Sequence, residues 1–539
     1  MERVPLSVII LTKNEAGRLR DCLESIRWAE EVLVIDDEST DETVALARSL
    51  GARVLQRKMD VEGRHRNWAH AHATHEWILS LDADERVTPE LAEEIRALIA
   101  RGAPHPLYAI PRRNYIGRVW LQHGGWYPSA QLKLFKKSAF RWEETLVHPR
   151  AIGEGTCGQT RHDLRHYSYR DLADFVAKLN RQTTLEAQKW IADGRGVTLG
   201  NAMWRSVDRF VRSYVGKRGY RDGRWGFIMA VMAGAYQFLS YAKVWERRLL
   251  RPSEGSARSV RHFSKRRNRE KCQTLQRARL TVLLLTKNEE ARLSACLEGL
   301  RWADELVVVD GQSTDRTREI AGAAGAVVIE RPFSGSFAAE RNAGLDAATG
   351  EWVLQMDADE EISPELRASV EALLFRGSPH AAFKVRRRNF FLGHRMRYGG
   401  WYHYNLVLFR RTAGRYEGLV HERLQVRGTI GVIHGDLIHR PFDSLSQFID
   451  RQNRYTSLQA EDVLRAGPPV SASRLRYEVS VRPFKLWWKL YVKKQGFREG
   501  MHGLIFSLLF AWVHFLKWAK YWELTSDLRD DARSLQAQG

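Results

Sequence analysis

The sequence predicts an α/β protein made of two consecutive domains of the same fold, each a largely parallel β-sheet covered by helices on both faces. Two observations lead to this prediction. Long stretches of the first half of the chain recur in the second half, and apolar runs of strand length alternate with segments of helical periodicity. Strands that are apolar throughout are typical of parallel sheets buried on both faces. A chain of 539 residues is also too long for a single core.

The duplication covers nearly the whole chain. The stretch from Val8, "VIILTKNEAGRLRDCLESIRWAEEVLVIDDESTDET", matches the stretch from Val282, "VLLLTKNEEARLSACLEGLRWADELVVVDGQSTDRT". The match continues through "RRN" and "GGWY" to the C-terminal motifs "YAKVWE" and "WAKYWE". We therefore predict two domains with helical tails, at residues 1–246 and 280–539. A basic linker, residues 247–279, joins them and carries twelve Lys or Arg against two Glu.

Within each domain the predicted elements follow one another in α/β order. In the first copy an apolar run at residues 6–11 predicts a buried strand, and Leu19, Cys22, Leu23 and Ile26 then lie on one face of a helix. "EVLVID", "GARVLQR" and "EWILSLDADE" predict three further strands, and the Ser and Asp of the turn "DDESTDET" suit a helix N-cap. Ligands of such sheets bind beyond the carboxyl ends of the strands, where these acidic motifs lie.

The composition bounds the class of protein. A hydrophobic content of 44% with 28% charged residues is ordinary for globular proteins, whereas the net charge of +21 suggests a polyanionic partner. The spacing of the cysteines indicates neither a disulfide framework nor a zinc site; these are Cys22, Cys157, Cys272 and Cys296. The N-terminus is predicted to be a first strand rather than a signal peptide, which favours a cytoplasmic protein.

An acid pair occurs once in each copy, in "SLDADERVTPEL" and "QMDADEEISPEL". On an extended backbone the two side chains of Asp-x-Asp point to the same side. Two carboxylates close together suit Mg²⁺ or Mn²⁺, with substrate phosphates completing the coordination shell. The alternative is a solvated acidic turn that caps the helix starting at Pro89 or Pro364. Repetition of the pair in the same strand-end setting favours the metal site.

The order of the motifs carries a family resemblance. "LTKNE", "VVVDGQSTD", "ERNAGL", "MDADEEISPEL" and "GLVHE" follow one another as in the inverting glycosyltransferases of family 2, which have the Rossmann-like GT-A fold. Both halves resemble most the lipopolysaccharide-core β-1,4-glucosyltransferases, which also end in a basic, aromatic-rich amphipathic tail. The resemblance covers nearly all of both copies, the linker excepted.

The resemblance implies roles for matching residues of both copies. Lining the uridine pocket would be Thr12, Glu15, Asp36, Asp37, Thr286, Glu289 and Asp310. Alongside the nucleotide would lie Arg66, Asn67, Arg341 and Asn342. Holding Mg²⁺ or Mn²⁺ on the diphosphate would be Asp82, Asp84, Asp357 and Asp359, with His166 and His439 as late histidines able to touch the metal or the phosphate.

The second copy also offers a general base. An inverting transfer needs a carboxylate that takes the proton of the attacking hydroxyl, and "LVHERL" supplies Glu422. The first copy reads "LVHPRA", with Pro149 in that place, and offers Glu143 and Glu144 as substitutes. We take Glu422 and Glu144 as the catalytic candidates and expect the second copy to be the stronger catalyst.

Two further motifs have less specific interpretations. The histidines of "RHRNWAHAHATHEW" have no counterparts in the second copy, so we interpret them as a solvated helix face rather than a metal cluster. The "GGWY" motifs fit neither a Walker nor a dinucleotide-binding pattern. They resemble the flexible acceptor-side loop of the GT-A fold, and a plain turn is the alternative.

Both copies end in an apolar segment preceded by a basic, aromatic one, such as "VRPFKLWWKLYVKKQGFREG". Trp and Tyr mixed with Lys and Arg are typical of segments at an anionic membrane surface. The sequence thus predicts a cytoplasmic protein, peripheral on the inner face of the cytoplasmic membrane; a buried helix and a membrane span remain alternatives for the apolar segments.

The predicted function is transfer of a hexose from a nucleotide-diphospho-sugar, a UDP-sugar by resemblance, to a lipopolysaccharide-core or other lipid-linked glycan, with no nucleic acid as partner. Charge alone would suggest a nucleic-acid-binding protein instead, but no recognised motif supports it. A nucleotidyltransferase of similar fold would need a loop rich in Gly and Lys after the first strand, which "LTKNEAGRLR" does not provide.

Overall fold

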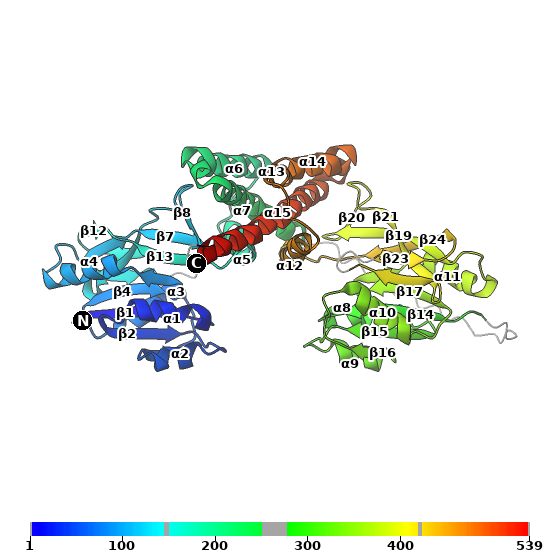
Figure 1. The fold of residues 1–539 in the computed structure, drawn as a ribbon, viewed down its shortest axis with the longest axis horizontal. Coiled ribbons are helices and arrows are strands. Elements are labelled where there is room, and N and C mark those ends of the chain that lie inside the picture. Colours follow the sequence, from blue (N-terminus) through cyan, green and yellow to red (C-terminus); the bar gives the residue numbers. More distant parts are fainter. Residues whose placement is uncertain (1–2, 145–149, 251–276, 419–422, 537–539) are drawn as a thin grey trace. The chain divides into compact units, whose positions relative to one another are not determined.

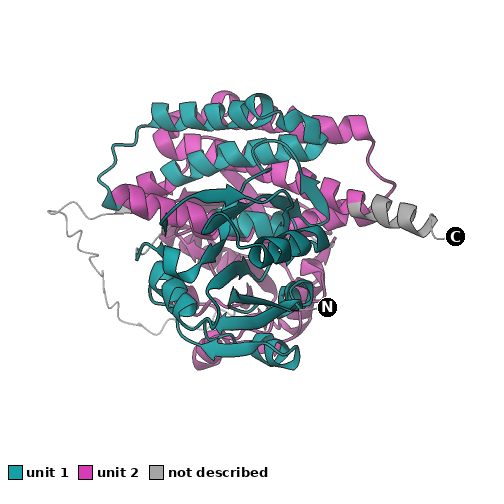
Figure 2. Ribbon diagram, turned by 90° about the vertical axis from the view of Figure 1, so that its left-hand side faces the viewer, with its two compact units in different colours: residues 1–179, 192–241 teal, residues 180–191, 242–539 magenta. Residues whose placement is uncertain are grey.

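The computed structural model describes residues 3–144, 150–250, 277–418 and 423–536 and contains two compact units (Figures 1 and 2). Unit 1 comprises residues 1–179 and 192–241, and unit 2 comprises residues 180–191 and 242–539. The predicted domain boundaries at residues 246 and 280 stay a prediction, and most of the predicted linker lies outside the described residues.

Unit 1 is built on a mixed sheet whose first strands are parallel (Figure 1). The strand order is β12-β6-β9-β4-β1-β2-β3, and β1 pairs in parallel with β2 and β4. The strands are β1 (Val4–Thr12), β2 (Ala29–Asp36), β3 (Arg53–Gln56), β4 (Trp77–Asp82), β6 (Leu107–Ile110), β9 (Gln131–Lys136) and β12 (Cys157–Gln159). A smaller sheet runs in the order β5-β13-β7-β8, with β5 (Glu85–Val87), β13 (Leu164–Tyr169), β7 (Arg112–Ile116) and β8 (Val119–Leu121), and β10 (Phe140–Trp142) pairs with β11 (Ala151–Gly153).

Alternation along β1 decides which helices cover each face of the sheet. Leu6, Val8 and Ile10 are fully buried on one face, in a core shared with α1 (Ala16–Ser25) and α4 (Pro89–Ala100). Ile9 lies on the other face, in a core shared with α3 (Glu62–Ala71). A fourth helix, α2 (Thr43–Ser49), joins β2 to β3. The predicted helix face of α1 is confirmed, because Leu19, Cys22, Leu23 and Ile26 are all buried.

Unit 2 repeats this plan with longer strands. Its sheet runs β16-β15-β14-β17-β21-β19-β24-β18, with β20 paired to β19. The strands are β14 (Leu280–Thr286), β15 (Glu305–Asp310), β16 (Val327–Glu330), β17 (Trp352–Asp357), β18 (Glu360–Ile362), β19 (Ala382–Phe391), β20 (His394–Arg395), β21 (His403–Arg410) and β24 (Ile430–His439). A hairpin, β22 (Gly414–Glu417) with β23 (Arg423–Val426), lies apart, and the helices are α8 (Glu290–Glu298), α9 (Thr317–Ala323), α10 (Phe337–Ala347) and α11 (Pro364–Arg376). The predicted α/β fold is confirmed in both units.

A helical tail follows each α/β part. The first consists of α5 (Leu172–Ala192), α6 (Leu199–Val211) and α7 (Gly223–Leu250), and the second of α12 (Leu445–Arg465), α13 (Ala472–Ser480), α14 (Arg482–Trp488) and α15 (Gly500–Gln536). Residues 219–249 and 496–526 are long and apolar enough to cross a membrane. Between half and two thirds of their most apolar stretches is nevertheless buried within the protein, as is common for core helices.

The lysine of each "AK" motif is buried and anchors its tail helix. Lys520 of α15 donates hydrogen bonds to the backbone oxygen (2.5 Å) and Oδ1 (2.6 Å) of Asn453, to Thr456 Oγ1 (3.0 Å) and to Ser457 Oγ (2.8 Å). Lys243 of α7 makes the same set of bonds to α5, and its acceptors are Asn180, Thr183 and Thr184. A buried ammonium is tolerated only with such partners, so this lysine fixes the position of α15 on α12.

Replacing Lys520 by Met should destabilise unit 2. The apolar side chain fills a similar volume but leaves the acceptors on α12 without this donor, which costs roughly 2 kcal/mol. Calorimetry of the full chain should show the melting temperature of unit 2 lowered by roughly 5 °C. The exposed Lys493, changed to Met, is the control, and equal melting curves for the two variants would contradict an anchoring role.

Candidate functional site

The candidate site lies at the carboxyl edge of the parallel strands. The register places Thr12 beside Asp36 and Leu11 beside Asp82 in unit 1. Unit 2 repeats it, with Thr286 beside Asp310 and Leu285 beside Asp357. Side chains that are far apart in the sequence thus meet at one edge in each unit, as the sequence predicts.

Asp36 and Asp310, the last residues of β2 and β15, are buried and shape the turns that follow. Asp36 accepts hydrogen bonds from the Ser39 amide (3.0 Å) and from Gln56 Nε2 (3.2 Å). Asp310 likewise accepts bonds from the amide (2.8 Å) and the hydroxyl (2.5 Å) of Ser313. The hydroxyls of the predicted threonines lie against them: Thr12 Oγ1 is 3.5 Å from Asp36, and Thr286 Oγ1 is 3.1 Å from Asp310.

The other predicted acids of this edge differ in exposure and partner. Asp37 bonds Lys13 Nζ and the Met59 amide, each at 2.8 Å, and unit 2 has Gly311 in its place. Glu15 and Glu289 precede helices α1 and α8. Burial raises the pKa of both, and the carboxylates of Asp84 and Asp359 respectively add to the rise. Both glutamates therefore lie close to the acid pairs.

The helices α3 and α10 each contribute an Arg-Asn pair. Arg66 lies 3.6 Å from Asp82, and Arg341 lies 3.4 Å from Asp357, so both arginines reach the first acid of the pair. Asn67 exchanges two hydrogen bonds with the backbone of Trp142 (2.7 and 2.9 Å). Asn342 does the same with Tyr416 (2.9 and 3.0 Å).

These asparagines therefore fasten helices to the β10 and β22 hairpins. Their proposed place alongside the nucleotide stays a prediction.

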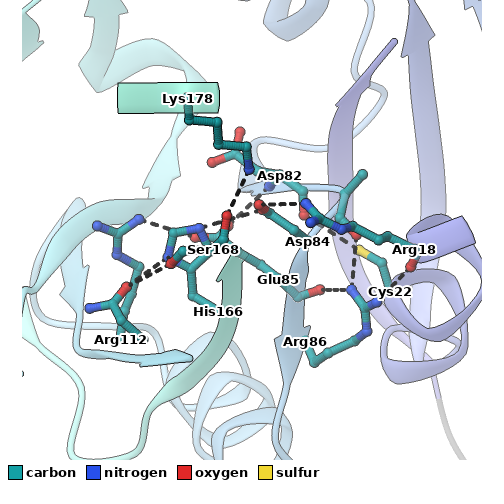
Figure 3. Close-up of polar contacts among 12 residues, drawn as sticks. Arg18, Cys22, Asp82, Asp84, Glu85, Arg86, Arg112, His166, Ser168 and Lys178 are labelled. Atoms are coloured by element: carbon teal, nitrogen blue, oxygen red, sulfur yellow. Dashed lines mark hydrogen bonds and ion pairs between the residues drawn. The ribbon is translucent and has the colours of Figure 1, made fainter. Parts of the chain in front are cut away.

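The acid pair itself has a different backbone from the one expected. Asp82 ends β4, but Asp84 lies in the turn before β5, and Asp357 and Asp359 repeat this arrangement. The prediction that the Asp-x-Asp segment has an extended backbone is therefore wrong. The second acid is instead brought to the site by the turn, where it faces a histidine of a neighbouring strand (Figure 3).

That histidine is the late histidine predicted in each copy. His166 Nε2 is 3.5 Å from Asp84 Oδ1, and His439 Nε2 is 3.5 Å from Asp359 Oδ1. The opposite ring nitrogens, Nδ1, bond the side-chain oxygens of Asn114 (2.7 Å) and Asn389 (2.6 Å).

Each of these asparagines is oriented in turn. Their amide nitrogens donate to the backbone oxygens of Trp126 and Trp401. The side-chain oxygen of each asparagine therefore faces the ring, and histidine Nδ1 carries the proton.

Two hydrogen-bond acceptors consequently face each other in unit 2. Burial, with Arg387 adding to it, lowers the pKa of His439 to about 2, so the ring is neutral and Nε2 presents a lone pair. Among the described residues, no group donates a hydrogen bond to the buried Oδ1 of Asp359. The Nε2 lone pair and Asp359 Oδ1, 3.5 Å apart, are groups that can bind one cation together.

The two units differ in how far their own cations neutralise the acids. Burial raises the pKa of Glu360 to about 7, and burial together with Asp357 raises the pKa of Asp359. In unit 1 burial also opposes ionisation, but Lys133 and Arg66 hold the pKa of Asp82 well below its usual range. In unit 2 Arg341 and Arg387 likewise lower the pKa of Asp357, so the units differ at the second acid, whose pKa is lowered in Asp84 by His166 and raised in Asp359.

Several residues at the site were not assigned a role from the sequence. Arg112 and Arg387 begin the repeated "RRN" motif and reach Glu85 (3.5 Å) and Glu360 (2.6 Å). Its asparagine holds the histidine described above. The recurrence of three polar residues in both copies was the available signal. Lys133, a lysine within the apolar strand "LKLF", was a second signal.

The structure describes one of the two catalytic candidates. Glu422 lies outside the described residues. Glu144 is about half exposed, and its carboxylate is 3.2 Å from Arg64 Nε and 3.5 Å from Asn67 Nδ2. It therefore lies beside α3, one residue from the predicted nucleotide contact Arg66.

The "GGWY" loops connect the site to the basic tail segments. Gly124 and Gly125 have positive φ, as do Gly399 and Gly400. The Gly124 amide donates to the backbone oxygen of Lys217 (2.9 Å), and the Gly399 amide donates to that of Lys494 (2.8 Å). The loop is thus bonded at one end to the tail and at the other, through its tryptophan carbonyl, to the asparagine of the site.

The histidine-rich helix α3 is not a solvated face. His65 and His70 are buried, and His70 packs against the rings of Phe135 and Phe140 with centroids 5.0 and 5.9 Å away. Burial lowers the pKa of His70 to about 3, so it behaves as a neutral aromatic core residue. The sequence interpretation was wrong on exposure. Within the described part of the chain, no group of three His, Cys, Asp or Glu residues forms a metal cluster.

Comparison with known proteins decides the family. The model of glycosyl transferase family 2 matches residues 7–152 and 281–422, more than half of the chain. The chain belongs to glycosyltransferase family 2. The two matches lie in units 1 and 2, each of which has the GT-A fold.

Related family 2 proteins match about half of this chain along most of their own length. An uncharacterised glycosyltransferase of Rickettsia typhi is 28% identical over 268 residues, which cover 47% of this chain and 89% of the relative. The lipopolysaccharide core biosynthesis glycosyltransferase LpsC of Rhizobium meliloti is 27% identical over 256 residues, covering 46% and 95%. The structure of S. aureus TarS 1-349 in complex with UDP is 16% identical, covers 46% and 92%, and has a TM-score of 0.25, too low to support an argument.

Family 2 glycosyltransferases commonly use a divalent metal ion, and the acid–histidine pairs fit one. Asp84 with His166, and Asp359 with His439, offer oxygen and nitrogen ligands that suit Mn²⁺, with Asp82 and Asp357 beside them. Bound there, the ion would offset the charge that develops on a departing diphosphate. The asparagines Asn114 and Asn389 bond Nδ1 and so orient each ring with Nε2 toward the second acid.

Removing that orientation should weaken unit 2. In Asn389→Ala the ring of His439 loses its fixed tautomer, and outer-shell changes of this kind typically cost about 10- to 100-fold in metal affinity or activity. Titration of Mn²⁺ and assay of sugar transfer by a chain with unit 1 disabled by Asp84→Asn should both show the loss. Gln425→Ala, an exposed change on β23, is the control. Unchanged Mn²⁺ affinity in Asn389→Ala would contradict the positioning role.

Proposed function

We propose that the chain is an inverting, membrane-peripheral glycosyltransferase. It moves a hexose from a UDP-sugar to a lipopolysaccharide-core or other lipid-linked cell-envelope glycan at the cytoplasmic face of the membrane, and unit 2 is the stronger catalyst. The observation that carries the proposal is the acid pair facing a histidine at the carboxyl edge of both family 2 domains. Membership of the family favours this activity over nucleic-acid binding or nucleotidyl transfer.

The residues of the edge supply the parts that a nucleotide-sugar enzyme needs. Arg66 and Arg341 bring guanidinium groups beside the first acid of each pair, where they can meet a diphosphate. In unit 2, Asp357 and Asp359 with His439 hold the metal, and Asp82, Asp84 and His166 are the matching groups of unit 1. Thr12, Glu15 and Asp37 of unit 1, and Thr286 and Glu289 of unit 2, line the side on which the nucleoside would lie, above the turns that Asp36 and Asp310 fix.

The proposed difference between the units follows from the base. Glu422 takes the proton of the acceptor hydroxyl in unit 2. Unit 1 has Pro149 at that place, which offers no proton acceptor, and Glu144 is half exposed and bonded to Arg64. Loss of a general base typically lowers the rate about 10²- to 10⁴-fold.

The tail segments support a membrane-bound acceptor. On α6, Trp204 is 71% exposed, and the apolar side chains of Val207 and Val211 are exposed on the same helix among arginines. On α14, Phe484 is 63% exposed and Trp488 is 45% exposed. Exposed apolar side chains interleaved with Arg and Lys fit the interface of an anionic leaflet.

The loop geometry joins that surface to the site. The "GGWY" loops are hydrogen-bonded through a glycine amide to Lys217 or Lys494 of the tail. Through the tryptophan carbonyl they accept a hydrogen bond from Asn114 or Asn389. An acceptor anchored in the leaflet would meet each site through this loop. LpsC, a relative, is named for lipopolysaccharide core biosynthesis, which is the class of acceptor we propose.

Loss of the second acid should abolish transfer in each unit. In a chain carrying both Asp84→Asn and Asp359→Asn, turnover of UDP-glucose, or of the UDP-sugar found active in a donor screen, should fall about 10²-fold or more, because a group that offsets developing charge is removed. Release of UDP in the presence of membrane extract measures it. Asp346→Asn, which breaks an exposed ion pair with Arg415, is the control. Transfer at the wild-type rate in the double variant would show that these acids only stabilise their turns.

Polar substitutions on the tail surface should release the protein from membranes. Trp204→Ser together with Phe484→Ser removes two exposed aromatic side chains, and partitioning onto vesicles containing phosphatidylglycerol should fall about tenfold or more. Sedimentation with vesicles measures it. Phe375→Ser is the matched control, because Phe375 is 60% exposed but lies on α11. Equal binding of both variants would place the membrane contact elsewhere.

A further inference from the structure

Lys133 of unit 1 occupies a place in the acid cluster that has no charged counterpart in unit 2. It lies in β9 with 5% of its surface exposed. Its Nζ donates hydrogen bonds to Asp82 Oδ2 (2.9 Å) and to Glu85 Oε2 (2.8 Å). An ammonium group therefore sits on the first acid of the pair and on the glutamate that follows it.

The equivalent residue in unit 2 is Val407. "LKLF" of β9 and "LVLF" of β21 align, and the strand register is the same: Leu134 pairs with Leu79, and Leu408 pairs with Leu354. Val407 is buried, at 6% exposure, in the hydrophobic core. The two units thus differ at one buried position by a full positive charge.

In unit 2 the corresponding acids contact arginines. Asp357 is 3.4 Å from both Arg341 and Arg387, and Glu360 Oε1 is 2.6 Å from Arg387. Unit 1 has matching arginines, with Arg66 3.6 Å from Asp82 and Arg112 3.5 Å from Glu85. Lys133 is present in addition to these arginines, and the uncharged Val407 takes its place in unit 2.

A buried ammonium at this position competes with a divalent ion. Like charges repel strongly at short range in a buried site, and a divalent ion arriving at Asp82 would meet that repulsion from Lys133. The ammonium also engages one carboxylate oxygen of Asp82 that a metal ion would use. Lysine serves well as a point charge for phosphate, so the same group can face a diphosphate directly.

We propose that Lys133 is a built-in cation of unit 1, which binds the nucleoside diphosphate with little help from a divalent ion, whereas unit 2 depends on that ion. This inference rests on the proposed function, because it takes the acid pair as the cation site of both units. The dissociation constant of unit 1 for Mn²⁺ is accordingly about tenfold or more higher than that of unit 2.

The test exchanges the two residues in the full chain. Asp359→Asn disables unit 2 and reports unit 1, and Asp84→Asn does the reverse. Free Mn²⁺ is followed by electron paramagnetic resonance during titration at saturating UDP. Lys133→Val in the first background should tighten Mn²⁺ binding about tenfold or more, and Val407→Lys in the second should weaken it by a similar factor. Lys133→Arg, which keeps the charge, and Lys136→Val, on the same strand, should leave the affinity of unit 1 unchanged.

The outcomes separate this inference from the proposed function. Lys133→Met, which keeps the length of the side chain, serves as a second variant should Lys133→Val fail to fold, as shown by calorimetry. Equal Mn²⁺ affinities in the two units, unaffected by either exchange, would overturn the inference. Absence of Mn²⁺ binding by both units would overturn it too, but sugar transfer measured in EDTA would then show the proposed activity to be intact.

Discussion

The parallel pairing of one central strand with its two neighbours is the constraint on which each unit depends. β1 lies between β2 and β4, and β14 lies between β15 and β17, so three carboxyl ends meet at one edge. Because a shift of register by one residue would turn every side chain to the other face, the apolar alternation that fills both cores also fixes where the acids stand. Packing and site geometry therefore have the same origin.

Much of this edge could be predicted from the sequence. The acids follow apolar runs in both copies, and duplication separates a repeated motif from an accidental one. Asn389 could not be assigned a role in this way. Its contact with His439 depends on the register of β19 against β24, and these two paired strands are far apart in the sequence. His70 was misjudged for a related reason: helical spacing does not say that the rings of Phe135 and Phe140 lie beyond the helix.

Duplication also shows which features of the site tolerate change. The bond from histidine to asparagine and the bond from that asparagine to a tryptophan carbonyl occur in both units with the same atoms. The cations around the first acid differ between the units, because Lys133 contacts Asp82 whereas the uncharged Val407 is its counterpart in unit 2. A histidine presented in a single tautomer is thus common to both sites, whereas the electrostatic surroundings of Asp82 and Asp357 have diverged between two otherwise similar frameworks.

The glycine-tryptophan loops have a mechanical consequence. In unit 2 only three hydrogen bonds separate His439 from the tail: His439 to Asn389, Asn389 to the Trp401 carbonyl, and the Gly399 amide to Lys494. A displacement of the tail backbone at Lys494 can therefore be transmitted to His439 through the loop, by a path that does not include the carboxyl ends of the parallel strands. The position of the tail and the orientation of the ring are thus mechanically coupled in unit 2.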